Sequence, residues 1–276
     1  MTLNVRNKRS VYAYKLKRRI RYILKKFYQR FSMAEDSRPV FILGSGRSGT
    51  DIVSYCLSKA WDAELINEDN PKAFDNWRLK GLDSVSGAVR KSGAKLILFK
   101  PIVETLRARE FLDYFPGSSV IFVIRNPYDA INSMVRFFGQ GHVKAVKGWV
   151  ATDFSRHPQA PDDLRQFIKA HCHEELSLED ASGLYWLLYN SAFHFLSLES
   201  ERRAMLVRYE HVVQNPNQTM EHVCRFLGMK WRASMTDEVY SGSLGKDLRP
   251  VLTPEIESAC LAQWERLTGE HLSNSI

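Results

Sequence analysis

The sequence predicts an α/β protein: a doubly wound parallel sheet flanked by helices, of the P-loop nucleotide-binding type, preceded by a basic amphipathic helix. Two observations carry the prediction for the sheet. Residues 41–57, FILGSGRSGTDIVSYCL, pass from an apolar run through a glycine-rich loop into an amphipathic segment, which is the pattern of a strand, an anion-binding turn and a helix. Further apolar runs then alternate with helical segments, without an internal repeat, and this alternation is typical of parallel sheets.

The basic residues divide the chain into two regions. Of 39 Lys and Arg residues, eleven lie in residues 1–32, where no Asp or Glu occurs, and the remainder holds 28 basic against 31 acidic residues. We therefore expect a basic segment with a linker at residues 1–38 and a single α/β domain at residues 39–276. The domain is close to neutral, so no nucleic-acid partner is expected.

Residues 12–31 predict the basic amphipathic helix. Their apolar side chains recur at helical spacing, and most of the cations fall on the other side. Such a helix can lie on an anionic membrane surface, which is the preferred interpretation, or it can dock on its own domain or on a partner. Binding to nucleic acid is the weakest alternative.

Cysteine spacing and hydropathy indicate the cellular setting. The four cysteines are far apart, which favours reduced thiols. No apolar run approaches the roughly 18 residues of a membrane span, and the N-terminus lacks the apolar core of a signal peptide. These features predict a cytoplasmic protein, either soluble or peripheral on the inner face of a membrane. The oligomeric state is left open.

The other elements follow from local patterns. Asn126 as N-cap and Pro127 as first residue predict a helix that begins at 127. Residues 139–178 predict a loop-rich segment with one helix near 162–171, and residues 240–246 predict a loop. The remaining strands are expected at 95–100, 119–124 and 204–208, and the helices at 51–60, within 72–94, and at 103–114, 127–138, 178–198, 216–227 and 254–267.

Residues 44–50 predict an anion-binding loop. Its three glycines allow successive amides to converge on an anion at the positive end of the following helix. Thr50 stands where a nucleotide P-loop has its lysine, and Asp51 stands where it has Ser or Thr. The loop therefore keeps the anion cradle and lacks the lysine and magnesium-ligand positions of an ATPase. A glycine turn without a ligand is the alternative.

Three stretches together resemble the sulfotransferases that use 3′-phosphoadenosine 5′-phosphosulfate. They are the loop 44–50, Arg125 followed eight residues later by Ser133, and VRYEHVV at 207–213 with its following Asn-Pro and Phe-Leu-Gly. The resemblance covers about residues 39–268 and leans toward the tyrosyl-protein and bacterial branches. It implies transfer of a sulfuryl group to an acceptor hydroxyl by in-line displacement, with a carboxylate base and without a metal, and release of 3′-phosphoadenosine 5′-phosphate.

The resemblance also implies roles for individual residues. Arg125 and Ser133 would hold the 3′-phosphate, and Lys100 would reach the leaving oxygen, although a surface charge is an equal alternative for Lys100. A structural role at the sheet end is the favoured alternative for Tyr209. Arg47 would act both in binding and as an electrostatic catalyst. The remaining donor-binding residues would be Gly46, Arg47, Ser48, Gly49 and Thr50 on the 5′-phosphosulfate, and Ser243 and Lys246 in a late loop.

Glu68 is the expected base. It stands 21 residues after Arg47, close to the spacing of the tyrosyl-protein branch, and Asp69 or a histidine within 139–173 is the substitute. Asp51 has no assigned role, because a carboxylate beside a phosphate is repulsive. The acceptor stays open between carbohydrate, lipid, peptide and small alcohol.

Two other functions are compatible with the loop. A small-molecule kinase is one, and the missing lysine and magnesium ligand count against it. A non-enzymatic, membrane-associated adaptor on a P-loop scaffold is the other, and the Arg125–Ser133 pair counts against that one.

Overall fold

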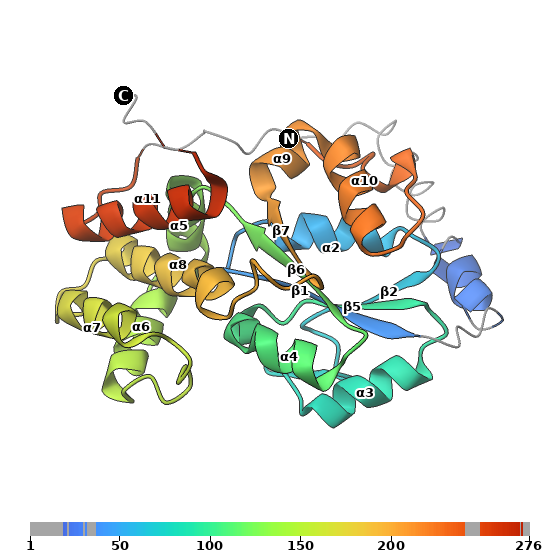
Figure 1. Ribbon diagram of the computed structural model, residues 1–276, viewed down its shortest axis with the longest axis horizontal. Coiled ribbons are helices and arrows are strands. Elements are labelled where there is room, and N and C mark those ends of the chain that lie inside the picture. The colour runs from blue at the N-terminus through green and yellow to red at the C-terminus, as the bar shows by residue number, and fades with distance from the viewer. Residues whose placement is uncertain are drawn as a thin grey trace, which may run out of the picture.

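The computed structural model describes residues 19–20, 22–29, 31, 37–240, 249–270 and 272. Its centre is a five-stranded sheet in the order β2-β5-β1-β6-β7, with every neighbouring pair parallel (Figure 1). The predicted doubly wound parallel sheet is therefore confirmed. The strands are β1 (Arg38–Gly44), β2 (Ala63–Ile66), β5 (Leu96–Phe99), β6 (Ser119–Ile124) and β7 (Ala204–Arg208).

Helices cover both faces of this sheet. One face carries α2 (Thr50–Ser58), α9 (Tyr209–Gln214) and α10 (Pro216–Phe226), and the other carries α3 (Leu82–Lys91) and α4 (Ala108–Tyr114) (Figure 1). Successive side chains of a strand point to opposite faces. In β1 this places Val40 and Ile42 in one buried cluster and Phe41 and Leu43 in the other. The unbroken apolar runs of the sequence thus reflect strands that are buried on both sides.

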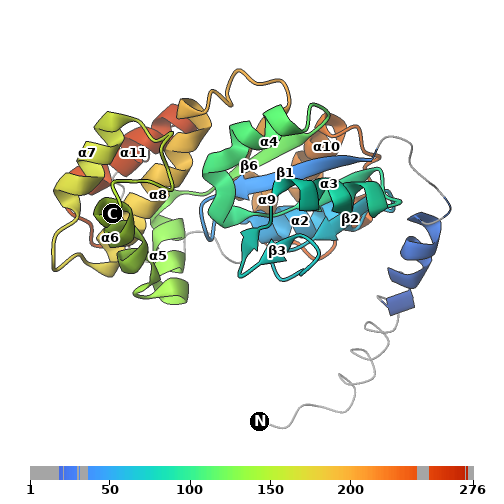
Figure 2. The same cartoon turned by 90° about the horizontal axis from the view of Figure 1, so that it is seen from below.

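A group of helices packs beside the sheet. It contains α5 (Pro127–Phe138), α6 (Gly141–Ala151), α7 (Asp162–His171), α8 (Leu178–Phe195) and α11 (Pro254–Thr268) (Figures 1 and 2). The long helix α8 packs against α5, α6 and α11. Trp186 of α8 and Trp264 of α11 are fully buried within this group.

Two segments differ from the sequence predictions. The helix α6 lies in the segment 139–178, which was expected to be rich in loops. Two glycines weaken its helix propensity, but Val143, Val146 and Trp149 are buried, and this packing outweighs propensity. Residues 72–94 contain a hairpin of β3 (Phe74–Asp75) and β4 (Arg78–Leu79) before α3.

Shorter differences occur at element boundaries. The segment 103–114 begins as a 3-10 helix, η1 (Ile102–Arg107), before α4. The four-residue edge strand β2 and the six-residue helix α9 were not predicted, because segments this short carry little periodicity. Strands β6 and β7 and helix α5 have the predicted bounds.

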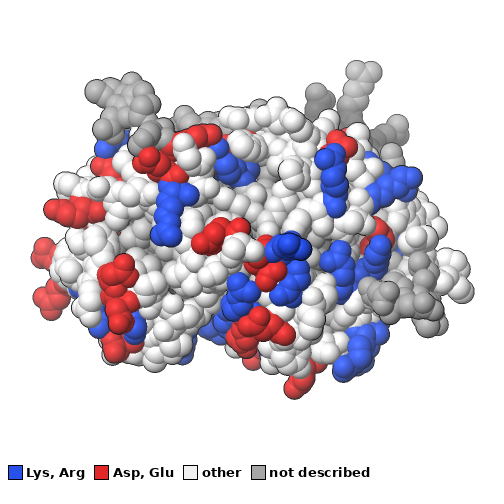
Figure 3. Space-filling model, viewed as in Figure 1, with Lys and Arg blue, Asp and Glu red and all other residues white. Residues whose placement is uncertain are grey.

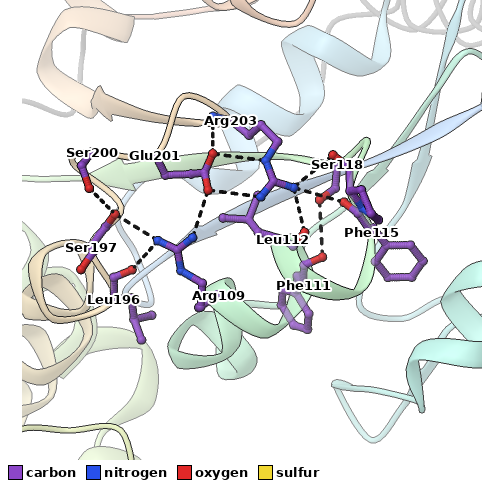
Figure 4. Close-up of polar contacts among 11 residues, drawn as sticks. Arg109, Phe111, Leu112, Phe115, Ser118, Leu196, Ser197, Ser200, Glu201 and Arg203 are labelled. Atoms are coloured by element: carbon purple, nitrogen blue, oxygen red, sulfur yellow. Dashed lines mark hydrogen bonds and ion pairs between the residues drawn. The ribbon is translucent and has the colours of Figure 1, made fainter.

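At the amino ends of β6 and β7, a polar network joins α4, α8 and β7 (Figure 4). Glu201 accepts hydrogen bonds from Arg109 at 3.0 Å and from Arg203 at 3.2 Å. Arg203 also donates to the carbonyls of Leu112 at 2.7 Å and Pro116 at 3.1 Å. The network therefore satisfies backbone carbonyls at the sheet end opposite the anion-binding loop, and we interpret it as structural.

The N-terminal helix is described at residues 19–20, 22–29 and 31, all helical. Its polar side lies on the edge strand: Gln29 is buried and donates to the carbonyls of Trp61 and Ala63, both at 3.0 Å, and Lys26 pairs with Glu64. Its apolar stripe is exposed, with Phe27 63% and Phe31 69% accessible. The same helix thus docks on its own domain and presents an apolar surface outward. The other exposed apolar residues of the stripe are Ile20, Ile23 and Leu24.

Candidate active site

The predicted site residues lie at the carboxyl ends of the five parallel strands. Residues 45–49 follow β1, and one residue separates Glu68 from the end of β2. Lys100, Arg125 and Tyr209 directly follow β5, β6 and β7, respectively. Ligands bind at this edge in open parallel sheets, especially where the chain crosses to the other side of a central strand. Here β5 and β6 lie on either side of β1, so β1 and its loop occupy the crossing point.

The loop is packed too closely for side chains at two of its glycines. A Cβ at Gly44 would lie 2.3 Å from the Val123 carbonyl oxygen, and one at Gly49 would lie 2.2 Å from the Tyr209 ring. Gly49 also has φ 95°, which disfavours other residues. The loop backbone therefore packs tightly against β6 at Gly44 and against Tyr209 at Gly49, just before α2.

Two loop hydroxyls are buried without a partner. Ser45 and Ser48 are fully buried, and neither Oγ has a hydrogen-bond partner in the described part of the chain. Buried hydroxyls are normally satisfied. Together with the amides at the start of α2, they form a donor set that fits an anion such as a phosphate or sulfate.

Arg47, Arg125, Ser133 and Tyr209 meet beside this loop. Arg47 Nε donates to Ser133 Oγ at 3.2 Å, although these residues lie 86 positions apart. Arg125 Nη1 is 3.5 Å from the Arg47 carbonyl oxygen, and its guanidinium lies over the Tyr209 ring, 4.6 Å from the centroid. Asp129 is 3.8 Å from Arg125. The two motifs of the sequence prediction thus form one basic corner.

Lys100 lies between two carboxylates. Its Nζ is 2.7 Å from Glu68 Oε2 and 2.8 Å from Asp51 Oδ1. Its side chain is only 7% accessible, so the alternative of a surface charge is wrong. Burial alone would lower the pKa of Lys100, but the hydrogen bonds that its ammonium donates to Asp51 and Glu68 outweigh burial and raise the pKa. Asp51, which had no assigned role, is therefore an ion-pair partner of Lys100, and its side chain is 73% accessible.

Glu68 is held by the turn that follows β5. Its side chain is 11% accessible, and its Oε1 accepts a hydrogen bond from the Ile102 amide at 3.3 Å. Asp69, a substitute base in the sequence prediction, is exposed. Glu68 is thus the acidic residue of this turn that contacts Lys100.

The histidines of 139–173 include two buried rings. Burial lowers the pKa of His142 to about 4, and this ring stacks on Tyr185 at 4.1 Å between centroids. Burial, assisted by Arg78 and Arg156, lowers the pKa of His157 to about 4. Both rings are therefore neutral at pH 7, and neither contacts Lys100.

Thr105 connects the loop to η1. Its hydroxyl accepts a hydrogen bond from the Gly44 amide at 3.1 Å, and it lies 2.9 Å from the carbonyl oxygens of Gly44 and Ile102, to one of which it donates. The residue is fully buried. No sequence motif identified it, because its partners lie 61 positions away or in a turn without a recognisable pattern.

The remaining predictions are placed as follows. Tyr209 packs on Gly49 and Arg125, and its neighbour Glu210 accepts from the Asn126 amide at 2.8 Å, which tethers the ends of β6 and β7. Ser243 and Lys246 lie outside the described residues.

In the described part of the chain, no group of three His, Cys, Asp or Glu side chains could hold a metal ion. No helix in the same residues is long and apolar enough to cross a membrane.

Comparisons with known proteins point to one family. Residues 37–244 match the sulfotransferase domain family. Among curated relatives, a 3-alpha-hydroxysteroid sulfotransferase of Cavia porcellus is 26% identical over 204 residues, which cover 70% of this chain and 60% of the relative. A 3-beta-hydroxysteroid sulfotransferase of the same species is 21% identical over 215 residues, which cover 68% of this chain and 67% of the relative. The chain thus spans 60–67% of the length of these relatives.

Among solved structures, the sulfotransferase domain from the curacin biosynthetic pathway superimposes with a TM-score of 0.51 and 16% identity. The alignment covers 83% of this chain and 98% of that domain. At this identity the likeness establishes the fold.

Proposed function

Because the chain belongs to the sulfotransferase family, we propose that it transfers a sulfuryl group from 3′-phosphoadenosine 5′-phosphosulfate to an acceptor hydroxyl. The observation that carries the proposal is the basic corner, in which Arg47 of the loop contacts Ser133 and Arg125. Such a corner provides cations for both phosphate-bearing ends of one nucleotide.

The donor is proposed to bind across this corner. Gly46, Ser48, Gly49 and Thr50 would supply amides and hydroxyls to the 5′-phosphosulfate, together with the Arg47 cation. Arg125 and Ser133 would bind the 3′-phosphate, with Tyr209 holding the guanidinium of Arg125 by its ring. Ser243 and Lys246 remain proposed donor contacts.

The catalytic roles are proposed for Glu68, Lys100 and Arg47. Glu68 takes the proton of the acceptor hydroxyl as its oxygen attacks sulfur. A new O–S bond forms while the bond from sulfur to the phosphate oxygen breaks. Lys100 and Arg47 stabilise the negative charge that develops on that leaving oxygen. The product retains both phosphates as 3′-phosphoadenosine 5′-phosphate.

Asp51 is proposed to serve, together with Glu68, as a counterion of Lys100. The Lys100 ammonium has two carboxylate partners. It can therefore turn toward a leaving oxygen and still keep one ion pair. The accessible Asp51 carboxylate is then free to be solvated, which limits its repulsion of the donor.

Thermal unfolding tests the donor specificity. 3′-Phosphoadenosine 5′-phosphate at 100 times its dissociation constant is expected to stabilise the protein by about 2.7 kcal/mol, because only the folded state binds it. ADP, which lacks the 3′-phosphate, should give a smaller shift in melting temperature at the same concentration. A shift with ATP and magnesium alone would indicate the small-molecule kinase instead.

For the N-terminal helix, we propose contact with an anionic membrane, at the inner face if the protein is cytoplasmic. The stripe from Ile20 to Phe31 is exposed, the docked side of the helix faces β2, and the sequence of this segment is rich in Lys and Arg. Apolar side chains can enter the headgroup region while cations near the surface add on the order of 1 kcal/mol each.

Vesicle sedimentation tests this membrane contact. Full-length protein should sediment with vesicles that contain phosphatidylserine, and deletion of residues 1–32 should abolish it. The double variant Ile23→Ser, Phe27→Ser is the sharper comparison, since it retains every cation and the contacts of Gln29. Unchanged sedimentation of the double variant, or none by the full-length protein, would refute the proposal.

A further inference from the structure

A basic cavity lies alongside η1, and no residue of the anion-binding loop is part of its lining. Its volume is about 330 Å³, and it is lined by three arginines and one glutamate. The glutamate and one arginine come from η1, which begins two residues after Lys100. The lining residues are Arg78, Val103, Glu104, Leu106, Arg107, Arg156 and His157.

The lining carries an excess of positive charge. Glu104 pairs with Arg78 at 3.0 Å and with Arg107 at 3.4 Å, and Arg107 is also held by both oxygens of Glu110 at 2.6 Å. No described residue forms an ion pair with the exposed Arg156. Thus even when Glu110 is counted, one more cation than anion faces this region, since His157 is neutral.

One residue of the lining has an unsatisfied polar atom. His157 is buried, and its Nδ1 has no hydrogen-bond partner among the residues that the structure describes. Its ring packs edge-on against Trp149 at 5.4 Å. A buried ring nitrogen that lacks a partner is costly unless a ligand or water supplies one.

Two turns, one before Arg78 and one before Arg156, contain non-glycine residues with positive φ. Six non-glycine residues of the described chain have positive φ. Four of them form the hairpin turn Asn76–Trp77, directly before Arg78, and the pair Asp153–Phe154, shortly before Arg156; a fifth is Arg47 of the loop. In a two-residue hairpin turn, positive φ at both positions is the ordinary geometry, but the pair Asp153–Phe154 lies outside a hairpin, and backbone strain of that kind concentrates at ligand-binding sites.

A chain of contacts runs from Glu68 to the lining of the cavity. The Ile102 amide, at the start of η1, donates to Glu68, and the next residue, Val103, lines the cavity and accepts from Tyr189 at 3.3 Å. Tyr189 stacks on Tyr185, with 4.2 Å between the ring centroids. η1 therefore carries residues of both places, Ile102 beside Glu68 and Val103 in the lining of the cavity.

From this arrangement, and resting on the proposed sulfuryl transfer, we propose that the cavity binds an anionic group of the acceptor. The acceptor class is then a hydroxyl compound that also carries a carboxylate, sulfonate or phosphate. Arg156 and Arg78 would bind this group by charge-assisted hydrogen bonds, and His157 would donate or accept one more. This group would lie beside η1, next to the reacting hydroxyl at Glu68.

Matched acceptors test the proposal without requiring turnover. The probes are phenol, 4-hydroxybenzoate, 4-hydroxybenzenesulfonate and 4-hydroxyphenyl phosphate. Their dissociation constants are measured by ligand-observed NMR on full-length protein saturated with 3′-phosphoadenosine 5′-phosphate, so that the donor site is already filled. At least one anionic probe is expected to bind about tenfold more tightly than phenol, and the order among the three identifies the preferred group.

Arg156→Gln is the decisive variant, because this exposed side chain supports no described ion pair. It should remove most of the preference for the anion and leave phenol binding unchanged. Arg202→Gln, an exposed arginine before β7, is the matched control and should retain the preference. Equal binding of phenol and all anionic probes, or a preference that survives in Arg156→Gln, would overturn the proposal.

Failure of this test can be told apart from failure of the proposed function. Binding of 3′-phosphoadenosine 5′-phosphate depends on the loop and on Arg125, which the cavity variants do not touch. If that nucleotide binds but the anionic probes show no preference, only the anionic cavity is refuted. If the nucleotide itself does not bind, the donor assignment fails first.

Discussion

Replacement of Glu68 by glutamine is expected to lower kcat by about 1000-fold, within the range for loss of a general base. Glutamine keeps one oxygen that can accept from the Lys100 ammonium or from the Ile102 amide, and its NH2 group replaces the other oxygen, so thermal unfolding of the variant is measured as a control for the fold. The proton of the acceptor hydroxyl, however, loses its acceptor. The measurement is single-turnover sulfuryl transfer, with affinity for 3′-phosphoadenosine 5′-phosphate determined in parallel and expected to be unchanged.

Asp69→Asn is the matched control for Glu68→Gln. It removes an exposed carboxylate from the adjacent position of the same turn and should leave kcat unaffected. Turnover close to normal in Glu68→Gln would mean that another residue is the base, and a large loss in Asp69→Asn would identify which one.

Replacement of Arg125 by glutamine is expected to weaken binding of 3′-phosphoadenosine 5′-phosphate by about 100-fold. That corresponds to about 2.7 kcal/mol, the range for charge-assisted hydrogen bonds to a phosphate. Affinity for ADP should change little, because ADP lacks the 3′-phosphate that Arg125 is proposed to bind. Calorimetric titration of both nucleotides against both proteins isolates this one contact.

The control for Arg125→Gln must separate binding from folding. Arg125 is buried and lies close to Asp129 and over Tyr209, so thermal unfolding of the ligand-free variant is measured first. Arg225→Gln on the exposed side of α10 removes the same charge from a residue 76% accessible and should alter neither nucleotide. An equal loss of affinity for ADP and for 3′-phosphoadenosine 5′-phosphate would contradict the assignment.

The sequence predicted the sheet and the strand ends because those elements have strong local signals. The run 120–124 is apolar throughout, Asn126-Pro127 is a helix start, and the glycine spacing of 44–49 fits few structures other than a turn that binds an anion. Since parallel strands bring their carboxyl ends to one edge, the proximity of Lys100, Arg125 and the loop follows from the fold class alone.

Other features could not be predicted, because they depend on contacts between distant segments. The partner of Asp51 is a lysine 49 residues away that becomes buried only when β1 and β5 pair. The helix α6 forms because of packing against α8 despite its two glycines. The basic cavity combines a two-residue strand, a 3-10 helix and an irregular segment, none of which is long enough or regular enough to show a periodic pattern.

The Thr105 hydroxyl couples the anion-binding loop mechanically to η1. It joins the last residue of β1, from which the anion-binding loop departs, to the helix that lines the basic cavity. Opening of either segment must break the same buried hydrogen bonds, so local unfolding of one segment loosens the other. A ligand that rigidifies the loop would then slow amide hydrogen exchange along η1, and occupancy of the cavity would slow exchange at Gly44, without any change in the average positions of the atoms.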